Sequence, residues 1–207
     1  MLPGPNVIKQ CSQCEQPFAE PTLMSGNTFG ATFWTDGKRE APMLPETPWL
    51  VKCPHCGQML WLDEAKELGE EEPFGRSSRW PGARRYAELT ESDYLAAVGM
   101  PLADSAEKVR YIRMRAWWAA NDRLRRDSGE AGGAVPEDTR HNMEALLAGL
   151  SEADQQERLM RAELARELGR FDEAVRLLAT NYSDELQHVV RRISDLVKER
   201  KTRVETL

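Results

Sequence analysis

Apolar positions follow two different spacings along this chain of 207 residues. Before residue 70 they form short runs with aromatic and β-branched residues, such as 28–35 and 49–52, and such runs favour strands. From residue 83 onward they recur every three or four positions, which places them on one face of a helix. The pattern therefore predicts an α+β protein, with a small β-rich N-terminal part followed by an all-α domain.

The second part divides into segments with caps, glycines or prolines at their ends. A capping-box pattern opens one segment at Ser151 and Asp154, and glycines end others. Another segment begins at Asp104 or Ser105 and carries apolar side chains roughly along one face. The helices that we expect span 92–98, 104–126, 137–150, 153–168, 175–179 and 184–203.

The β-rich part has clear turn signals. Asp36-Gly37 follows the run 28–35, and an Asp-Gly pair in that position predicts a hairpin turn. Asp63 can cap a short helix over 64–68, which Gly69 would end. We therefore expect at least one hairpin and one short helix in this part of the chain.

The sign of the charge changes abruptly between the two parts. Residues 70–72 are all glutamate, whereas 73–85 contain four arginines and no acid. Residues 1–10 are rich in proline and glycine, so we expect order there only where they lead into the first cysteine pair. The expected organisation is a domain at 1–70, a linker at 71–82 and a helical domain at 83–207.

Composition indicates a globular protein that is not embedded in a membrane. Apolar residues make up 41% and charged residues 30% of the chain. No apolar run approaches the roughly 18–20 residues that span a bilayer, and the first residues lack a signal-peptide pattern. We therefore expect a cytoplasmic protein without a membrane partner, whose cysteines stay reduced. The net charge of −6 argues against nucleic-acid binding by the chain as a whole.

All four cysteines fall into two C-x-x-C pairs, with 38 residues between the pairs. Two residues between cysteines let both thiolates of a tight turn bind one ion, and two such turns supply a tetrahedral shell. Four thiolates fill that shell and leave no position for water, so the pattern predicts one structural Zn²⁺ and not a catalytic one. The expected zinc ligands are Cys11, Cys14, Cys53 and Cys56.

The order of short strand, cysteine turn and short helix after a hairpin, over 49–68, resembles the zinc-ribbon and treble-clef folds. The resemblance implies a small domain that is held together by its metal. Two alternatives remain open at this point. The four thiols could be free of metal, or His55 could replace one cysteine as a ligand, although a histidine in this position more often points to solvent.

The motif Leu168-Gly169-x-Phe171-Asp172-Glu173-Ala174 resembles the turn and second-helix start of a tetratricopeptide repeat. In that family the glycine lets the chain leave the first helix, the aromatic ring lies between helices, and the alanine permits close packing. The resemblance covers 153–181 and implies a hairpin that binds a partner protein. It departs from the family at Arg161 and Ala162, and no second copy is clear. A lone hairpin packed for stability is the alternative.

The last predicted helix, at 183–203, carries an apolar stripe. This stripe could cap the repeat-like hairpin, or it could form the seam of a homodimer.

The stretch 104–128 carries seven basic and four acidic residues, together with two adjacent tryptophans. Such a surface could contact phosphates and stack on bases. The same pattern also fits tryptophans in a helical core covered by arginine stems, which is the more common arrangement. The candidate contacts with nucleic acid or another partner are Arg110, Arg113, Trp117, Arg123 and Arg126.

No catalytic motif stands out, since the sequence has no Gly-rich phosphate loop, no G-x-S-x-G elbow and no H-E-x-x-H. The expectation is therefore a non-enzymatic adaptor or regulatory protein that binds another protein through its helical domain. The alternative is a nucleic-acid-binding factor that uses the zinc ribbon and the helix at 104–128. Binding to DNA or RNA that weakens steeply with salt would separate the two.

Overall fold

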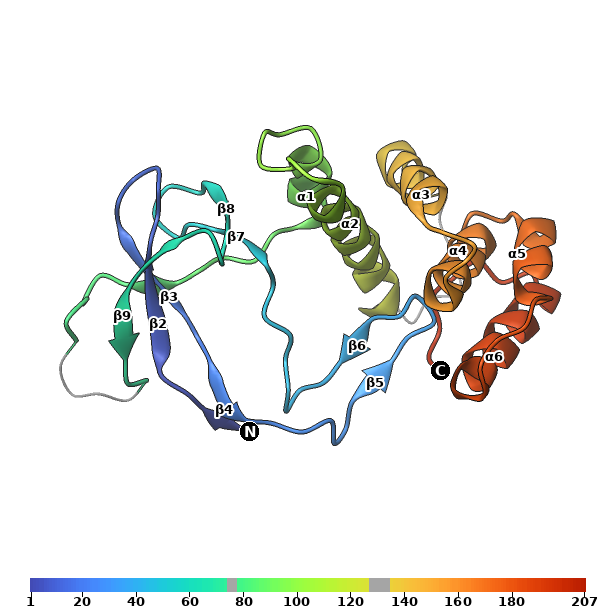
Figure 1. Ribbon diagram of the computed structural model, residues 1–207, viewed down its shortest axis with the longest axis horizontal. Helices are drawn as coiled ribbons and strands as arrows, with labels where there is room; N and C mark the ends of the chain where they lie inside the picture. The colour runs from blue at the N-terminus through green and yellow to red at the C-terminus, as the bar shows by residue number, and fades with distance from the viewer. Residues whose placement is uncertain (74–77, 127–134) are drawn as a thin grey trace. The chain divides into compact units, whose positions relative to one another are not determined.

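The computed structural model describes residues 1–73, 78–126 and 135–207. The chain forms two compact units, which we call the N-terminal unit and the helical unit. The N-terminal unit comprises Met1–Ala31 and Glu40–Leu89, and the helical unit comprises Thr32–Arg39 and Thr90–Leu207. Strands occupy the first part of the chain, and six α-helices, counted over the described residues, follow in the second (Figure 1). This order confirms the expected mixture of strands first and helices afterwards.

A four-stranded sheet forms the centre of the N-terminal unit. Its strands are β2 (Asn6–Gln10), β3 (Pro17–Glu20), β9 (Lys66–Glu71) and β10 (Arg84–Arg85). The strand order is β10-β3-β2-β9, with β2 antiparallel to both of its neighbours and β10 parallel to β3. Residues 6–10, for which we expected little order, supply a central strand because β3 and β9 pair with their backbone on both sides.

Two smaller strand pairs complete the unit. They are β1 (Leu2–Pro3) with β4 (Leu23–Ser25), and β7 (Leu50–Lys52) with β8 (Met59–Trp61), both antiparallel. The strand expected at 49–52 is thus confirmed. The β2–β3 hairpin turns at the first C-x-x-C pair and the β7–β8 hairpin turns at the second.

The short helix expected over 64–68 is wrong, because this stretch enters strand β9. Gly69 lies inside the strand at φ +146°, and the ring of Trp80 lies 2.8 Å from the place that a β-carbon would take. Pairing with β2 and this close ring contact therefore override the local capping signal at Asp63.

The boundary between the units differs from the expected division at 71–82. Strand β10 extends the sheet, and the amide of Tyr86 donates to the carbonyl of Ala19 at 3.2 Å. Residues 83–89 therefore belong with the N-terminal unit and not with the helices. Part of the expected linker, 74–77, lies outside the described residues.

A hairpin from the spacer between the cysteine pairs belongs to the helical unit. Its strands are β5 (Thr32–Phe33) and β6 (Arg39–Glu40), which pair with each other. The Asp36-Gly37 turn between them is the turn that the sequence predicts, and Gly37 adopts φ +81° as such turns require. The 38-residue spacer thus serves both units.

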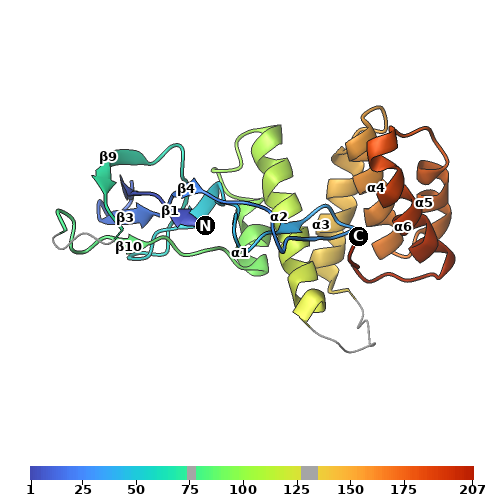
Figure 2. The same ribbon diagram turned by 90° about the horizontal axis from the view of Figure 1, so that it is seen from below.

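Six α-helices and a 3₁₀ turn build the rest of the helical unit, counted over the described residues (Figure 2). The helices lie where the apolar spacing predicts them, and the first four agree within two residues at each end. The fifth begins four residues before the expected start at 175. The elements are α1 (Glu91–Ala97), α2 (Ala106–Arg126), α3 (Glu137–Gly149), α4 (Gln155–Glu167), α5 (Phe171–Leu178), η1 (Asp184–Leu186) and α6 (Gln187–Lys198).

The last helix ends at Lys198 and not near residue 203. Arg200 adopts φ +53°, a left-handed conformation that ends the helix. The following tail then runs along the spacer hairpin, where the amide of Thr35 donates to the carbonyl of Glu205 at 2.9 Å. Residues that are far apart in the sequence therefore close the helical unit at this edge.

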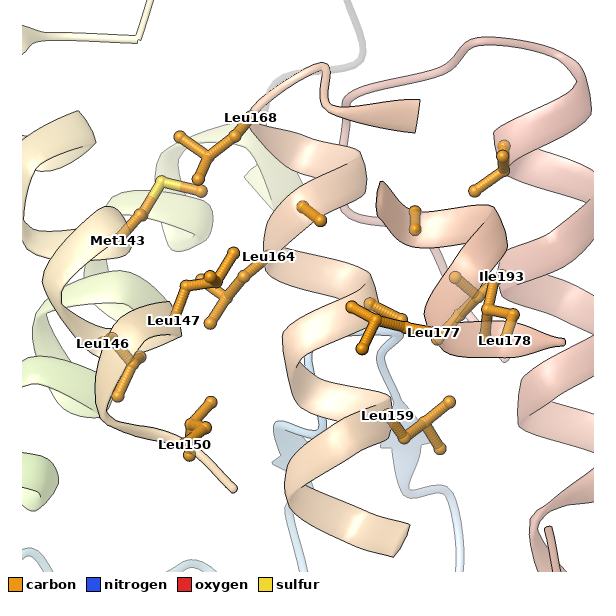
Figure 3. Close-up of a cluster of buried hydrophobic side chains, with 14 of the residues drawn as sticks. Met143, Leu146, Leu147, Leu150, Leu159, Leu164, Leu168, Leu177, Leu178 and Ile193 are labelled. Atoms are coloured by element: carbon orange, nitrogen blue, oxygen red, sulfur yellow. The ribbon is translucent and has the colours of Figure 1, made fainter. Parts of the chain in front are cut away.

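An apolar core joins α3, α4, α5 and α6 (Figure 3). Leu147 of α3 and Leu164 of α4 point toward each other, and Leu177 lies between α4 and α5 (Figure 3). Helix α4 contacts α3, α5 and α6, and its last six residues are buried, so it is the central helix of this core. Trp117 of α2 belongs to the same core and is fully buried.

Polar groups cross this core in a connected chain of hydrogen bonds. The Glu167 carboxyl accepts from the indole of Trp117 at 2.8 Å and from the Asn121 amide at 3.2 Å. The same amide nitrogen of Asn121 donates to the Asp36 carboxylate of the spacer hairpin at 3.0 Å. Asn121 therefore links a carboxyl group of α4 to one of the hairpin. Burial raises the pKa of Glu167 well above its usual value.

The raised pKa of Glu167 predicts a helical unit whose stability falls with rising pH. The folded unit keeps a proton on Glu167 at pH values where the unfolded chain, with a glutamate pKa of about 4.3, has released it. The free energy of unfolding should therefore decrease from about pH 4.3 upward until the folded group also ionises. Urea unfolding of Glu167→Gln at pH 5 and pH 8 should show a smaller pH dependence than wild type. Glu185→Gln, at an exposed position, is the control. An unchanged slope in Glu167→Gln would refute the buried Glu167 carboxyl as the cause.

Candidate metal centre

The four cysteine sulfurs lie together in the N-terminal unit. All four Sγ atoms are within 4.8 Å of one another, with 3.8 Å between Cys11 and Cys56 and 3.7 Å between Cys14 and Cys53. A tetrahedral shell with Zn–S bonds of about 2.3 Å has sulfurs about 3.8 Å apart. The spacing of these sulfurs therefore fits a single tetrahedral metal ion, and it draws one pair of ligands from each hairpin.

The two cysteine turns have the same backbone design. In the first, the amide of Cys11 donates to Gln16 and the amide of Glu15 donates to Cys11, at 3.1 and 2.9 Å. The second turn repeats this arrangement with Cys53 as its first residue, at 2.8 and 3.0 Å. The residue after the second cysteine is left-handed in both turns, with φ +57° at Glu15 and +77° at Gly57. This shared geometry points both thiolates of each turn at one place.

The left-handed position after each cysteine pair leads to a matched pair of predictions. Gly57→Ala should lower the stability of the N-terminal unit by about 1–2 kcal/mol, because an alanine at this φ is strained although the space beside it is open. Glu15→Gly should not lower it, because glycine relieves the same strain in the first turn. Metal-loaded protein unfolded in urea provides the measurement. Equal destabilisation by both substitutions would contradict the shared geometry.

Backbone amides and burial act on the thiols in opposite directions. Burial raises the pKa of Cys53 to about 12, even though the amide of His55 donates to its sulfur at 3.4 Å. The amide of Gln58 lowers the pKa of Cys56, whose side chain is exposed. A thiol with a pKa near 12 keeps its proton at neutral pH without a cation, so an ion that binds here must release that proton. The amide donors then stabilise the metal-bound thiolates.

His55 does not join the ligand group. Its Nε2 lies 3.0 Å from the carbonyl oxygen of Pro17, and the side chain is exposed. The potential ligand set found among the described residues consists of the four cysteines. With four sulfurs in place, the shell has no position left for water or a substrate.

Apolar side chains surround one side of the cysteine cluster. Cys11 and Cys53 are buried, whereas Cys14 is partly buried and Cys56 is exposed. Together with their neighbours they form the small core of the unit, which includes Phe18, Val51, Leu60, Leu62 and Tyr86. An ion bound at the sulfurs would thus tie the two hairpins together at the edge of this core.

The candidate partner-binding residues of α2 do not form one surface. Trp117, expected as a contact, is fully buried and donates to Glu167, so it offers no face to a base or a partner. Arg110 pairs with Glu157, and Arg123 pairs with Glu91 at 3.0 Å. Arg126 ends α2, but its side chain lies outside the described residues.

Arg113 differs from these arginines. It is half-buried, and its Nη1 donates to the amide oxygen of Asn142 at a long 3.3 Å. Burial lowers the pKa of Arg113, and no carboxylate of the described residues lies within ion-pair distance of it. The spacing of arginines along α2 could not predict this difference. It depends on the tertiary structure, which places acidic residues beside some of these arginines and not beside Arg113.

The net negative charge of the N-terminal unit argues against nucleic-acid binding by this unit. This unit contains 7 Lys and Arg and 11 Asp and Glu, a net charge of −4, and the helical unit carries 21 and 23, a net charge of −2. A divalent ion on four thiolates adds a further −2 to the N-terminal unit. Backbone phosphates prefer a basic surface.

Comparison with protein-family models, curated proteins and solved structures finds no match to this chain. The likenesses to a zinc ribbon and to a tetratricopeptide hairpin therefore depend on the residues themselves. Within the described residues, no helix has the length and apolar character needed to cross a bilayer.

Proposed function

We propose that this protein is a non-enzymatic adaptor or regulatory protein, in which a structural Zn²⁺ holds the N-terminal unit and the helical unit binds another protein. The closed arrangement of four sulfurs carries this proposal, because a filled shell supports folding and leaves no coordination position for catalysis. Four thiolates at tetrahedral spacing favour zinc among the common metals. The four cysteines form no disulfide, which supports the reducing cytoplasm that we propose as the location.

The repeat-like hairpin supports the adaptor role. Helices α4 and α5 pack against each other, and α6 contacts both. Gly169 adopts φ +76° between α4 and α5, and Ala174 is fully buried, and both observations support the likeness to a tetratricopeptide repeat. In this proposal the hairpin presents a protein-binding surface and α6 caps it. A homodimer through α6 is part of the same proposal.

Two measurements on the purified full-length chain test this function. Native mass measurement should give one zinc per chain and the number of chains per particle. Cross-linking of a captured partner, followed by its reconstitution as a complex of purified proteins, should place the contacts on α1–α6. A different metal would refute the zinc assignment, and a reconstituted complex whose cross-links all fall on the N-terminal unit would refute the adaptor role of the helices.

Nucleic-acid binding is the second candidate, and the exposed Arg123 of α2 is the observation that favours it. Its test is binding to single- and double-stranded DNA and RNA over a range of salt concentrations. Affinity that falls steeply with salt would support it, and absence of binding at low salt would exclude it.

A further inference from the structure

Two hollows lie side by side on the helical unit and share one residue, Arg113. The first, of about 560 Å³, lies between α2 and α3 and has a mainly apolar wall. The second, of about 500 Å³, lies among α1, α2 and α3. The first wall includes Ala106, Val109, Ala145, Leu146 and Gly149, and the second includes Ser92, Leu95, Val98, His141 and Asn142.

The guanidinium of Arg113 has unused hydrogen-bonding capacity where the hollows meet. An arginine has five N–H donors, and among the described residues the guanidinium of Arg113 makes one long hydrogen bond, to Asn142. Asn142 is itself buried and fixed, because its amide donates to the main-chain carbonyl of Arg113 at 2.9 Å. The arginine is therefore held at the junction with most of its donors free.

Three other arginines of α2 pair with acids, whereas none of the described residues brings an acid to Arg113. Arg110 pairs with Glu157, Arg123 with Glu91, and Arg125 with Asp36. No nitrogen of Arg113 is among the buried atoms without a hydrogen-bond partner, so its unpaired N–H groups reach solvent and are accessible to an anion from outside the chain. A planar carboxylate matches the fork of an arginine in a bidentate pair.

The remaining charges around the hollows select the kind of anion. Glu107 lines the first hollow and Asp138 lines the second, and both repel any added anion, a polyanion such as nucleic acid more strongly than a single carboxylate. Arg110 also lines the first hollow, but its guanidinium already forms an ion pair with Glu157. One unpaired guanidinium beside an apolar wall suits one carboxylate beside an apolar side chain.

We propose that this junction binds an acidic amphipathic segment of a partner protein. An Asp or Glu carboxylate of the segment pairs with Arg113, and a neighbouring apolar side chain fills the hollow between α2 and α3. The inference rests on the proposed adaptor function and specifies the chemistry of the partner. It places the binding surface on α1–α3, in addition to the repeat-like hairpin.

The experiment uses full-length protein and an array of synthetic helical peptides with leucine and glutamate on one face. Each peptide has a matched copy in which glutamine replaces glutamate. We expect the acidic copies to bind in a fluorescence anisotropy titration and the glutamine copies to bind at least about tenfold more weakly, as a charged hydrogen bond predicts. Arg113→Gln should reduce binding by a similar factor, and Arg113→Lys should recover only part of it. Arg123→Gln is the matched control and should leave binding unchanged.

Three results would overturn the proposal: no acidic peptide binds, the glutamine copies bind equally well, or Arg113→Gln and Arg123→Gln have the same effect. Competition by inorganic phosphate as strong as that by the acidic peptide would also overturn it, because it would indicate a simple anion site. If the affinity of a reconstituted protein complex does not change with Arg113→Gln, this inference is refuted, whereas the proposed adaptor function is not.

Discussion

Chelation of the metal, or Cys53→Ser, should unfold the N-terminal unit while α1–α6 keep most of their far-ultraviolet circular dichroism signal. The β2–β3 and β7–β8 hairpins belong to different sheets, and the cysteine cluster joins them. Strands of two to six residues around a small core bury little apolar surface, so under the proposed function they depend on the ion. Structural zinc contributes about 10–16 kcal/mol of apparent binding free energy in small zinc domains. The loss of this binding free energy is larger than the free energy of unfolding that we expect for a unit of this size.

Hydrogen exchange read peptide by peptide measures this prediction best. Amides of β2 and β3 should lose protection in Cys53→Ser, and those of α3 and α4 should keep it. Ser12→Ala is the matched control, because Ser12 is an exposed residue between the first two cysteines and supplies no sulfur. Continued protection of β2 after chelation would show that the unit folds without its metal.

Loss of the metal should have a second, smaller effect, because it weakens the docking of the spacer hairpin on the helices. Residues 32–39 stay with the helices, so an unfolded N-terminal unit turns residues 40–89 into a loop between the docked hairpin and α1. Closing a flexible loop of that length costs about 3–4 kcal/mol. Docking of the hairpin is therefore weaker in metal-free protein, and the Thr35 amide should lose more protection than amides of α4.

The parts of the fold that the sequence predicted are those with local causes. The helices follow from apolar spacing and caps, the Asp36-Gly37 turn from its two residues, and the metal ligands from the C-x-x-C spacing. Each of these depends on residues within one or two turns of the chain. The cysteine cluster is the one part of the candidate site that could be found this way.

The parts that were missed have long-range causes. Strand β2 has no alternating pattern and exists because β3 and β9 pair with it, and β9 replaces an expected helix for the same reason. The membership of 32–39 in the helical unit depends on Asp36, whose partners on α2, Asn121 and Arg125, lie more than 80 residues away. Arg113 resembles the other arginines of α2 in sequence, and only the fold shows that none of the described residues places an acid within ion-pair distance of it.

Arg125→Met should lower the free energy of unfolding of the helical unit by about 3–5 kcal/mol at neutral pH. The Arg125 side chain is 3% exposed and pairs with the Asp36 carboxylate, which is 0% exposed. Burial raises the pKa of Asp36 although Arg125 beside it acts in the opposite direction, so the carboxylate depends on its cation. Methionine preserves the apolar stem but removes the guanidinium that pairs with Asp36, while the Asn121 amide and the Lys38 backbone still donate to this carboxylate.

A second substitution separates the buried charge from the lost packing. Asp36→Asn removes the stranded charge, so Asp36→Asn/Arg125→Met should be more stable than Arg125→Met alone, by about 1–2 kcal/mol. Urea unfolding followed by circular dichroism provides the values. Arg123→Met is the control on the same helix, and it should cost less than about 1 kcal/mol because its pair with Glu91 is at the surface.

The pH dependence of the Arg125→Met variant is a further check on the same pair. Without the guanidinium, the pKa of Asp36 in the folded unit rises further, so the folded variant binds a proton that the unfolded chain releases above about pH 3.9. The deficit of Arg125→Met relative to wild type should therefore grow as the pH rises and shrink toward acid, where the proton replaces the cation. A deficit that is independent of pH, or one that Asp36→Asn does not reduce, would mean that Arg125 stabilises the unit through its contacts with Trp34 and Trp118 and not through its charge.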